Sequence, residues 1–249
     1  MIASERFNYI LTSLQQRGVI DIKSVAAELG ISEATVRRDF EKLEAEGKLT
    51  RVLGGAKQKD DFTGEAELTM RQRMIKKVNL PEKDSLAEYS SGLVEDGECI
   101  FIDAGTTFMP LFGRLVNRPI RIVTYSTLPF PMIRSAAAEI IFIGGSYSPF
   151  YNAVTGALAQ ELLSRFTFNR AFIGCSGLSA DFRTAYTTEI ECLTMKNIAM
   201  RNSEKKYLVL DVSKVGVTSF YKFSPTDAFD NVICNRFDAD GLPQNFILV

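Results

Sequence analysis

The chain of 249 residues contains no histidine. This absence removes the most common general base and the most common side-chain metal ligand. It also excludes every nucleophile arrangement that pairs serine or cysteine with histidine. An enzyme built on this sequence would have to use Lys, Glu or Asp for acid–base chemistry. The absence therefore favours a non-catalytic function, and we expect neither a cofactor nor a metal.

Cysteine is scarce, and long apolar runs are missing. The four cysteines are scattered and form no C-x-x-C pair, which argues against a disulfide framework or a zinc site and fits a reducing cytosol. No stretch approaches the roughly 20 apolar residues that a membrane-spanning helix needs. The N-terminus carries Glu5 and Arg6 and does not resemble a signal peptide. We expect a cytoplasmic protein with no membrane partner.

Neither sign of charge dominates the composition. The 29 basic and 30 acidic residues give a net charge of −1, so any nucleic-acid partner requires a local basic patch. Because 46% of the residues are hydrophobic and 24% are charged, the composition is that of an ordinary globular protein. The length suits either one α/β domain or a small domain followed by a larger one.

The first 32 residues predict two helices and the start of a third. Apolar residues recur at helical spacing within residues 4–16, and Gly18 ends that helix. Asp21 begins a second helix, which ends at Gly30. One residue later comes Ser32, whose side-chain oxygen can accept a hydrogen bond from the first turn of a third helix. The gap is short enough for a helix-turn-helix pair.

The third predicted helix contains "SEATVRRDF", residues 32–40. Val36, Phe40 and Leu43 form its apolar stripe, whereas polar and basic residues occupy the neighbouring positions. Gly47 ends the helix.

A small β-hairpin is predicted to follow. Residues 49–53 favour a strand, residues 54–55 a glycine turn, and residues 56–58 the returning strand. Three helices followed by a hairpin make a winged helix-turn-helix, which we assign to residues 1–58. Periodicity alone leaves one alternative open, a solvated three-helix bundle whose charges only keep the protein soluble.

The recognition helix of such a motif enters the major groove by its N-terminal half. There, short side chains approach bases, and arginines pair with phosphate or guanine. Basic side chains on the hairpin can reach the DNA backbone or a neighbouring groove. The residues predicted to contact DNA are Ser32, Glu33, Thr35, Arg37, Arg38, Lys42, Arg51 and Lys57.

The remainder of the chain changes character twice. Residues 59–94 are interpreted as a linker and connecting helices, because residues 58–64 are polar and a helical pattern over 65–94 is interrupted near residues 79–81. Residues 95–249 alternate short apolar strands with helical stretches. That alternation predicts an α/β domain with a mostly parallel sheet and helices on its faces.

Several motifs together resemble those of one protein family. They are Arg6, Ile10 and Leu14, then Ser32 and Thr35 to Phe40, "DAGTT" at 103–107, Gly144-Gly145, "AFIGCSGL" at 171–178, Glu191 with Lys196, and "DVSKVG" at 211–216. The pattern resembles the DeoR family of bacterial repressors. The resemblance implies a C-terminal sensor domain with a fold like that of ribose-5-phosphate isomerase, which binds a phosphorylated sugar or a related metabolite without catalysis. It also implies a structural role for Asp39, either orienting the arginines or bonding a neighbouring helix.

The stretch "FIDAGTT" indicates a ligand site from its own residues. A strand ends at Asp103, whose carboxylate suits sugar hydroxyls, and Gly105 lets the chain turn tightly. Thr106 and Thr107 then open a helix whose first N–H groups can hold an anion. The turn follows a parallel strand, at the edge where α/β proteins bind ligands. A plain threonine-capped turn is the alternative.

Other candidate ligand residues follow later strands. Gly144 and Gly145 leave room for a ligand, or form a simple turn. Lys214 can reach a phosphate as a point charge, and Glu191 can accept from sugar hydroxyls, although both also suit a solvated surface. Many members of the resembled family carry asparagine where this chain has Tyr125, which can donate one hydrogen bond or stack on a ligand. The predicted effector-binding residues are Asp103, Gly105, Thr106, Thr107, Tyr125, Gly144, Gly145, Glu191 and Lys214.

These observations predict a transcriptional regulator, namely a repressor of a sugar-utilisation operon that binds double-stranded operator DNA under the control of a phosphorylated sugar. Palindromic half-sites one helical turn apart, about 34 Å, require a homo-oligomer, a dimer or a tetramer. One alternative is a sugar-phosphate isomerase-like enzyme that carries a DNA-binding module and uses Asp103, Glu191 and Lys214 as acid–base groups. Another is a structural or adaptor protein that never contacts DNA.

Overall fold

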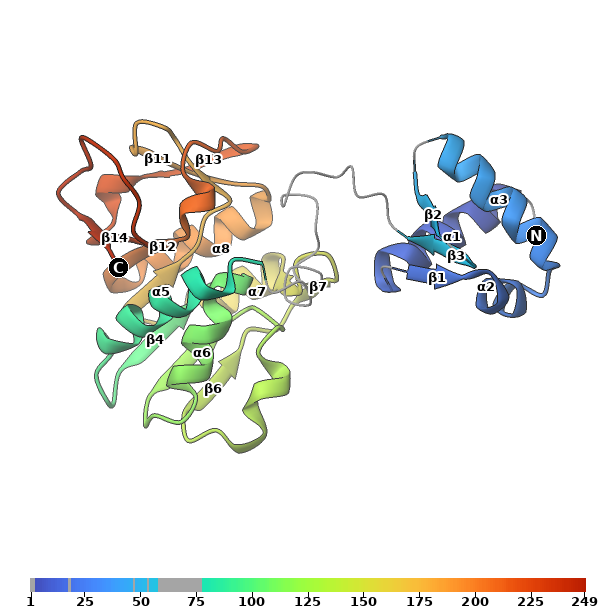
Figure 1. Ribbon diagram of the computed structural model, residues 1–249. Coiled ribbons are helices and arrows are strands. Elements are labelled where there is room, and N and C mark those ends of the chain that lie inside the picture. The colour runs from blue at the N-terminus through green and yellow to red at the C-terminus, as the bar shows by residue number, and fades with distance from the viewer. Residues whose placement is uncertain (1–2, 18, 47, 53, 58–77) are drawn as a thin grey trace. The chain divides into compact units, whose positions relative to one another are not determined.

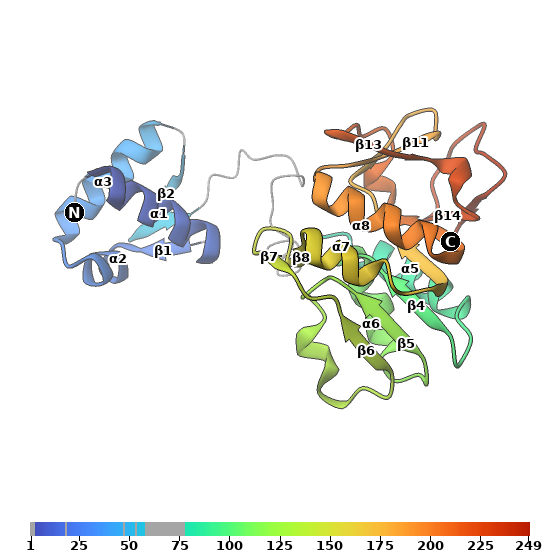
Figure 2. The ribbon, with the colours of Figure 1, turned by 180° about the vertical axis from the view of Figure 1, so that it is seen from behind.

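A computed structural model (Figures 1 and 2) describes residues 3–17, 19–46, 48–52, 54–57 and 78–249. The chain divides into two compact units, Met1–Glu67 and Leu68–Val249, which are described separately below. The predicted linker at 58–64 and the predicted helical residues 65–77 lie outside the described residues, as do Gly18, Gly47 and Leu53.

The N-terminal unit contains three helices and three short strands. They are α1 (Ala3–Arg17), β1 (Val19–Asp21), α2 (Ile22–Leu29), α3 (Glu33–Ala45), β2 (Thr50–Val52) and β3 (Gly55–Lys57). The strands form one antiparallel sheet in the order β1-β3-β2. Buried apolar side chains from all three helices, among them Ile10, Val25 and Phe40, form its core.

Local sequence signals set the helix boundaries of this unit. The Asp21 carboxylate accepts a hydrogen bond from the Ser24 N–H at 2.8 Å and so caps α2. Gly30 ends α2 in the left-handed region, at φ 63°. Ser32 then caps α3. The predicted short gap between the two helices is therefore confirmed.

The predicted hairpin differs from the observed sheet. Leu49 is buried before β2 begins, and Gly55 belongs to β3 rather than to a two-residue turn. The third strand, β1, was not predicted, because three residues between two helices carry no readable alternation. A side chain on Gly55 would place its Cβ 2.3 Å from the carbonyl oxygen of Ile20. The glycine therefore permits the close approach of β3 to β1.

The larger unit is built on a seven-stranded sheet in which every pair of neighbouring strands is parallel. Its strand order is β15-β14-β12-β9-β4-β5-β6. The strands are β4 (Cys99–Ile102), β5 (Arg121–Thr124), β6 (Glu139–Phe142), β9 (Phe168–Ile173), β12 (Ser203–Leu210), β14 (Asn231–Cys234) and β15 (Phe246–Leu248). The predicted fold class, a winged helix-turn-helix unit followed by an α/β unit, is confirmed.

Helices cover both faces of this sheet (Figures 1 and 2). One core layer joins strand residues such as Ile100 to Leu86 of α5 (Leu80–Gly92) and Phe112 of α6 (Met109–Leu115). The other joins Phe101 to α7 (Ala157–Leu163) and α8 (Ile190–Arg201). Alternate residues of β4 thus face opposite layers, as the pleat of a strand requires.

Smaller elements complete this unit. They comprise the hairpin of β7 (Ser146–Ser148) and β8 (Ala153–Thr155), the sheet of β10 (Gly177–Leu178), β11 (Thr184–Thr187) and β13 (Tyr221–Pro225), and the 3-10 helices η2 (Thr106–Phe108), η3 (Phe130–Ser135), η4 (Val212–Lys214) and η5 (Thr226–Ala228). The helical stretch predicted after β5 is only the 3-10 helix η3. Pro129 and Pro131 supply no backbone N–H there, which disfavours a regular α-helix.

Candidate functional site

The N-terminal end of α3 is a capped, exposed helix terminus. The Ser32 hydroxyl accepts from the Thr35 N–H at 3.2 Å, and the two side-chain oxygens lie 2.9 Å apart. Ser32 and Glu33 are exposed and Thr35 is half-buried. The short polar side chains predicted to approach bases are therefore presented at this end of the helix.

The predicted arginines of α3 face solvent. Arg37 and Arg38 are both exposed, as is Lys42. The Arg37 side chain is 63% accessible and lies 3.6 Å from Glu33, one turn earlier in the helix. An exposed pair of this kind contributes little to stability. These cations are consequently available to a polyanionic partner.

Asp39 points the opposite way, into the unit. It is 4% exposed, and its two carboxylate oxygens accept from the Arg6 guanidinium at 2.6 and 2.9 Å. This hydrogen-bonded carboxylate raises the pKa of Arg6. A two-point contact of this type fixes orientation as well as distance. Asp39 thus bonds a neighbouring helix, α1, and holds α3 with its arginines outward.

The predicted wing residues lie differently. Arg51, in β2, donates to Glu44 at 2.7 Å and to Glu41 at 2.9 Å, and its backbone N–H donates to Glu44 at 2.9 Å. These bonds tie β2 to the C-terminal half of α3 and direct the Arg51 guanidinium toward two carboxylates. The Arg51 side chain is still 44% accessible, so contact with DNA would share the guanidinium with these two carboxylates. Lys57 lies in β3, and its side chain lies outside the described residues.

In the larger unit, Asp103 is the centre of a buried polar cluster. It follows β4 and is 1% exposed. One oxygen accepts from the Tyr125 hydroxyl at 2.6 Å and the Ala104 N–H at 2.8 Å. The other accepts from the Gly174 N–H at 2.8 Å and pairs with the Lys196 ammonium. A carboxylate has about four lone-pair sites, so protein donors use all of them.

Tyr125, which directly follows β5, completes the cluster. It is 1% exposed, and burial, followed by the Asp103 charge, raises the pKa of its phenol well above the ordinary value. The hydroxyl is therefore a proton donor to Asp103 across the physiological pH range. Asp103 and Tyr125 were predicted to contact sugar hydroxyls. In this conformation the polar groups of both side chains are already hydrogen-bonded to protein.

The turn after Asp103 is sharp, but its first threonine faces inward. Gly105 adopts φ 148°, a region that glycine occupies far more readily than other residues. Thr106 is 7% exposed, and its hydroxyl accepts from Lys83 of α5 at 3.1 Å. The predicted helix opening begins as the three-residue η2, which leads directly into α6, and Phe108 at the junction is buried in the core. Thr107 is half-buried.

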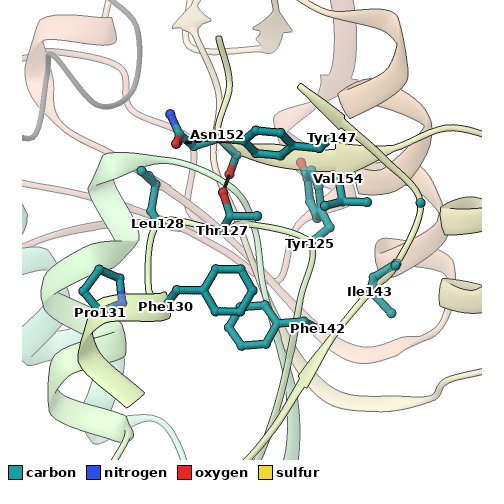
Figure 3. Close-up of a pocket in the computed structure, with 12 residues that line it drawn as sticks. Tyr125, Thr127, Leu128, Phe130, Pro131, Phe142, Ile143, Tyr147, Asn152 and Val154 are labelled. Carbon is teal, nitrogen blue, oxygen red and sulfur yellow. Dashed lines mark hydrogen bonds between the residues drawn. The ribbon is translucent and has the colours of Figure 1, made fainter. Parts of the chain in front are cut away.

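A cavity of about 760 Å³ lies beside this cluster, at the carboxyl ends of β5 and β6 (Figure 3). Twelve residues from the segments 125–131, 142–147 and 152–154 line it, including Tyr125, Gly144 and Gly145. Figure 3 shows Phe130 and Phe142 on one side and Tyr147 with Asn152 on the other. The volume is within the range of small-molecule sites. Three of the predicted effector residues thus meet at one cavity.

Six of the nine predicted effector residues do not line the cavity, and two of those six, Glu191 and Lys214, lie elsewhere on the unit. Glu191, in the first turn of α8, is half-buried and accepts from Gln160 of α7 at 3.2 Å. Lys214, in η4 after β12, is half-buried. Neither is among the residues that line the cavity. Glu191 joins two helices, and Lys214 belongs to a strand end three places from β5 in the sheet.

Two family profiles match the chain. The profile described as the DeoR-like helix-turn-helix domain covers residues 6–61, and the DeoR C terminal sensor domain covers residues 78–236. The chain belongs to the DeoR family. This family assignment agrees with the resemblance carried by the motifs.

Relatives of this DeoR-family chain match it along most of its length. The lactose phosphotransferase system repressor of Lactococcus lactis subsp. lactis is 31% identical over 218 residues, which are 86% of this chain and 84% of the relative. The repressor of the same name from Staphylococcus epidermidis is 27% identical over 239 residues, 95% and 93% of the two chains. Ribose 5-phosphate isomerase A from Methanocaldococcus jannaschii aligns over 55% of each chain, with TM-score 0.41 and 17% identity.

Two buried lysines of the DeoR sensor domain were missing from the predicted site. Lys196 is 5% exposed, and Lys83 is 3% exposed. Each stands on the apolar face of its helix; Lys196, for example, follows the buried Cys192 and Met195. A lysine on an apolar helix face is a readable signal, because burial of an ammonium requires a partner. The partner itself, Asp103, is 93 residues away in sequence and cannot be read from periodicity.

The described residues contain no group of three or more His, Cys, Asp or Glu side chains arranged to hold a metal ion. Within the same part of this DeoR-family chain, no helix is long and apolar enough to cross a lipid bilayer.

Proposed function

We propose that this DeoR-family chain represses genes of sugar utilisation by binding double-stranded operator DNA through α3, and that a phosphorylated sugar bound to the larger unit weakens that binding. The observation that carries the proposal is the orientation of α3. Asp39 anchors the inner face of α3 to Arg6 of α1, while Arg37 and Arg38 face solvent on the other. Relatives named as repressors, which match most of the chain, support the same function.

We also propose that the chain regulates transcription without catalysing a reaction. An isomerase would need a free carboxylate to move protons, and Asp103, the most buried candidate, has its lone pairs filled by protein donors. Relatives named as repressors support this choice over the enzyme. Incubation of the purified chain with pentose and hexose phosphates tests it, because turnover at ordinary enzyme rates would contradict a purely regulatory role.

We also propose that the chain acts in the cytoplasm as a homo-oligomer. Paired half-sites on DNA demand at least two recognition helices. Sedimentation of the chain with and without a palindromic operator fragment tests this, and a single bound monomer would exclude it.

The test of DNA binding uses Arg38→Ala in the full chain. Arg38 is exposed, so the substitution should leave folding intact while it removes one phosphate contact. We expect weaker binding to upstream DNA across sequences and a salt slope reduced by about 1. Arg165→Ala is the matched control, since Arg165 is also an exposed arginine but lies on the larger unit. Equal affinity of Arg38→Ala and the parent at several salt concentrations would show that α3 is not the DNA-recognition helix.

The effector is identified by a thermal-shift screen of pentose and hexose phosphates. A true ligand raises Tm in proportion to the logarithm of its concentration over Kd. The same compound must then reduce operator binding by the parent chain. If it tightens binding instead, the direction of the proposed control is wrong.

A further inference from the structure

The cavity at the carboxyl ends of β5 and β6 has an unusual wall chemistry for a sensor of a phosphorylated compound. Among the side chains that the structure describes, none of the twelve that line it carries a formal charge. Its principal polar groups already bond one another: the Thr127 hydroxyl donates to the Asn152 carbonyl at 2.9 Å, and the Tyr147 hydroxyl lies 3.1 Å from the Asn152 side-chain oxygen. An anion among these twelve described residues would lose hydration without gaining an opposite charge from any of them.

Aromatic rings supply the walls instead. Phe130 and Phe142 stack with centroids 4.2 Å apart and planes inclined by 21°. Phe130 is 50% exposed and Tyr147 is 53% exposed, so part of each ring is solvated and free to be covered. Across the cavity from Phe130, Tyr147 rises from the β7–β8 hairpin (Figure 3). Opposed, partly exposed rings of this kind are suited to the faces of another ring.

Two adjacent glycines line the cavity, and they differ in their surroundings. A Cβ on Gly145, at φ 153°, would come within 2.7 Å of the Thr155 carbonyl oxygen and 2.9 Å of the Ala159 methyl, so this position can carry no side chain. Gly144 is different, since a Cβ there would meet no atom within 4 Å. Gly144 is exposed and lines the cavity, so a side chain added there would project into open space at the cavity wall and not into a packed core.

We propose that this cavity binds the uncharged ring of a ligand, either a pyranose face or an aryl group, by stacking against Phe130 and Tyr147, and that it excludes phosphate. The inference rests on the proposed function in one respect, that the ring belongs to the effector. The effector's phosphate then lies outside the cavity. Specificity for the ring is set by the aromatic walls, while the buried Tyr125 floor links the cavity to Asp103 and Lys196.

The experiment titrates the full chain with two uncharged probes, phenyl β-D-glucopyranoside and phenyl β-D-galactopyranoside, and with inorganic phosphate as competitor. We expect at least one phenyl hexoside to bind, and phosphate not to displace it. Phe130→Ala should weaken that binding about two- to tenfold, the range expected for loss of one ring contact. Gly144→Leu should abolish it by filling the cavity. Phe220→Ala, which removes the 81%-exposed Phe220 outside the cavity, should bind like the parent.

Three outcomes would overturn the inference: no binding of either hexoside at millimolar concentration, displacement of the hexoside by phosphate, or unchanged affinity in Phe130→Ala and Gly144→Leu. Thermal unfolding of each variant verifies that it is folded. Failure of the proposed function has a separate signature, the absence of operator binding by the parent chain. Because probe binding and operator binding are measured independently, the two failures are distinguishable.

Discussion

Replacement of Lys196 by methionine isolates the buried pair beneath the cavity. The two side chains have similar length, so the change removes the charge, the bond to Asp103 and the 2.9 Å bond from Nζ to the Gly174 carbonyl. Breaking one partner of a buried ion pair costs about 3–5 kcal/mol. Asp103 keeps three neutral donors, from Tyr125, Ala104 and Gly174, so we expect the lower end, about 3 kcal/mol. For a unit of this size, that corresponds to a fall in Tm of roughly 6–12 °C.

Differential scanning calorimetry of the full chain measures the fall. Arg165→Met is the matched control, because it breaks an exposed Lys/Arg–carboxylate pair with Glu161 (70% and 64% accessible) and should cost at most about 0.5 kcal/mol. Adding Asp103→Asn to Lys196→Met should recover part of the loss, since the orphaned charge disappears. A loss below about 1 kcal/mol for Lys196→Met would refute the reasoning that this pair is desolvated.

Ser32→Ala removes the oxygen that caps α3 and should lower the stability of the N-terminal unit by about 1 kcal/mol, whereas Ser32→Asn retains most of it; urea unfolding compares the variants, and equal stability of parent and alanine forms would exclude the cap. Burial raises the pKa of the Cys192 thiol to about 11 and that of Cys234 to about 12. Because thiolate is the reactive form, Ellman's reagent at pH 8 should label both far more slowly in the folded chain than in urea, and equal rates would contradict their burial. The same raised pKa values make the free energy of unfolding depend on pH. Below pH 9 both thiols are protonated in the folded and unfolded chain, and as the pH rises from there through about 12 the unfolded thiols ionise first, so the free energy of unfolding declines. Thermal unfolding between pH 8 and 11 should show that decline.

Much of the fold could be predicted from local signals. Helix ends are marked by the capping side chains of Asp21 and Ser32 and by the backbone freedom of Gly30. The predicted positions of α2 and α3 are therefore confirmed. The apolar strands of the larger unit also predicted a parallel sheet. By contrast, β1 is three residues long and depends on pairing with β3, which no local pattern contains.

The site was harder to predict because tertiary contacts decide it. "FIDAGTT" correctly marks a strand end and a sharp turn, yet the pattern cannot say that Asp103 collects donors from 22, 71 and 93 residues away. The cavity likewise combines residues after β5 with others from the β7–β8 hairpin, a hairpin that looks like an irregular loop in sequence. In the sequence Arg51 has the pattern of an unpaired basic residue on the hairpin, and only the fold brings Glu41 and Glu44 beside it.

The convergence of four donors on Asp103 limits how this protein can acquire a new ligand preference. Tyr125 forms the floor of the cavity but also serves one of those oxygens, so exchanging it would disturb the link between β4 and β5 along with the binding surface. Among the hydrogen bonds of the described residues, Phe130 and Tyr147 make none to Asp103. Substitutions at Phe130 and Tyr147 can therefore change the preference for a sugar with less disturbance of the Asp103 cluster than substitutions at Tyr125.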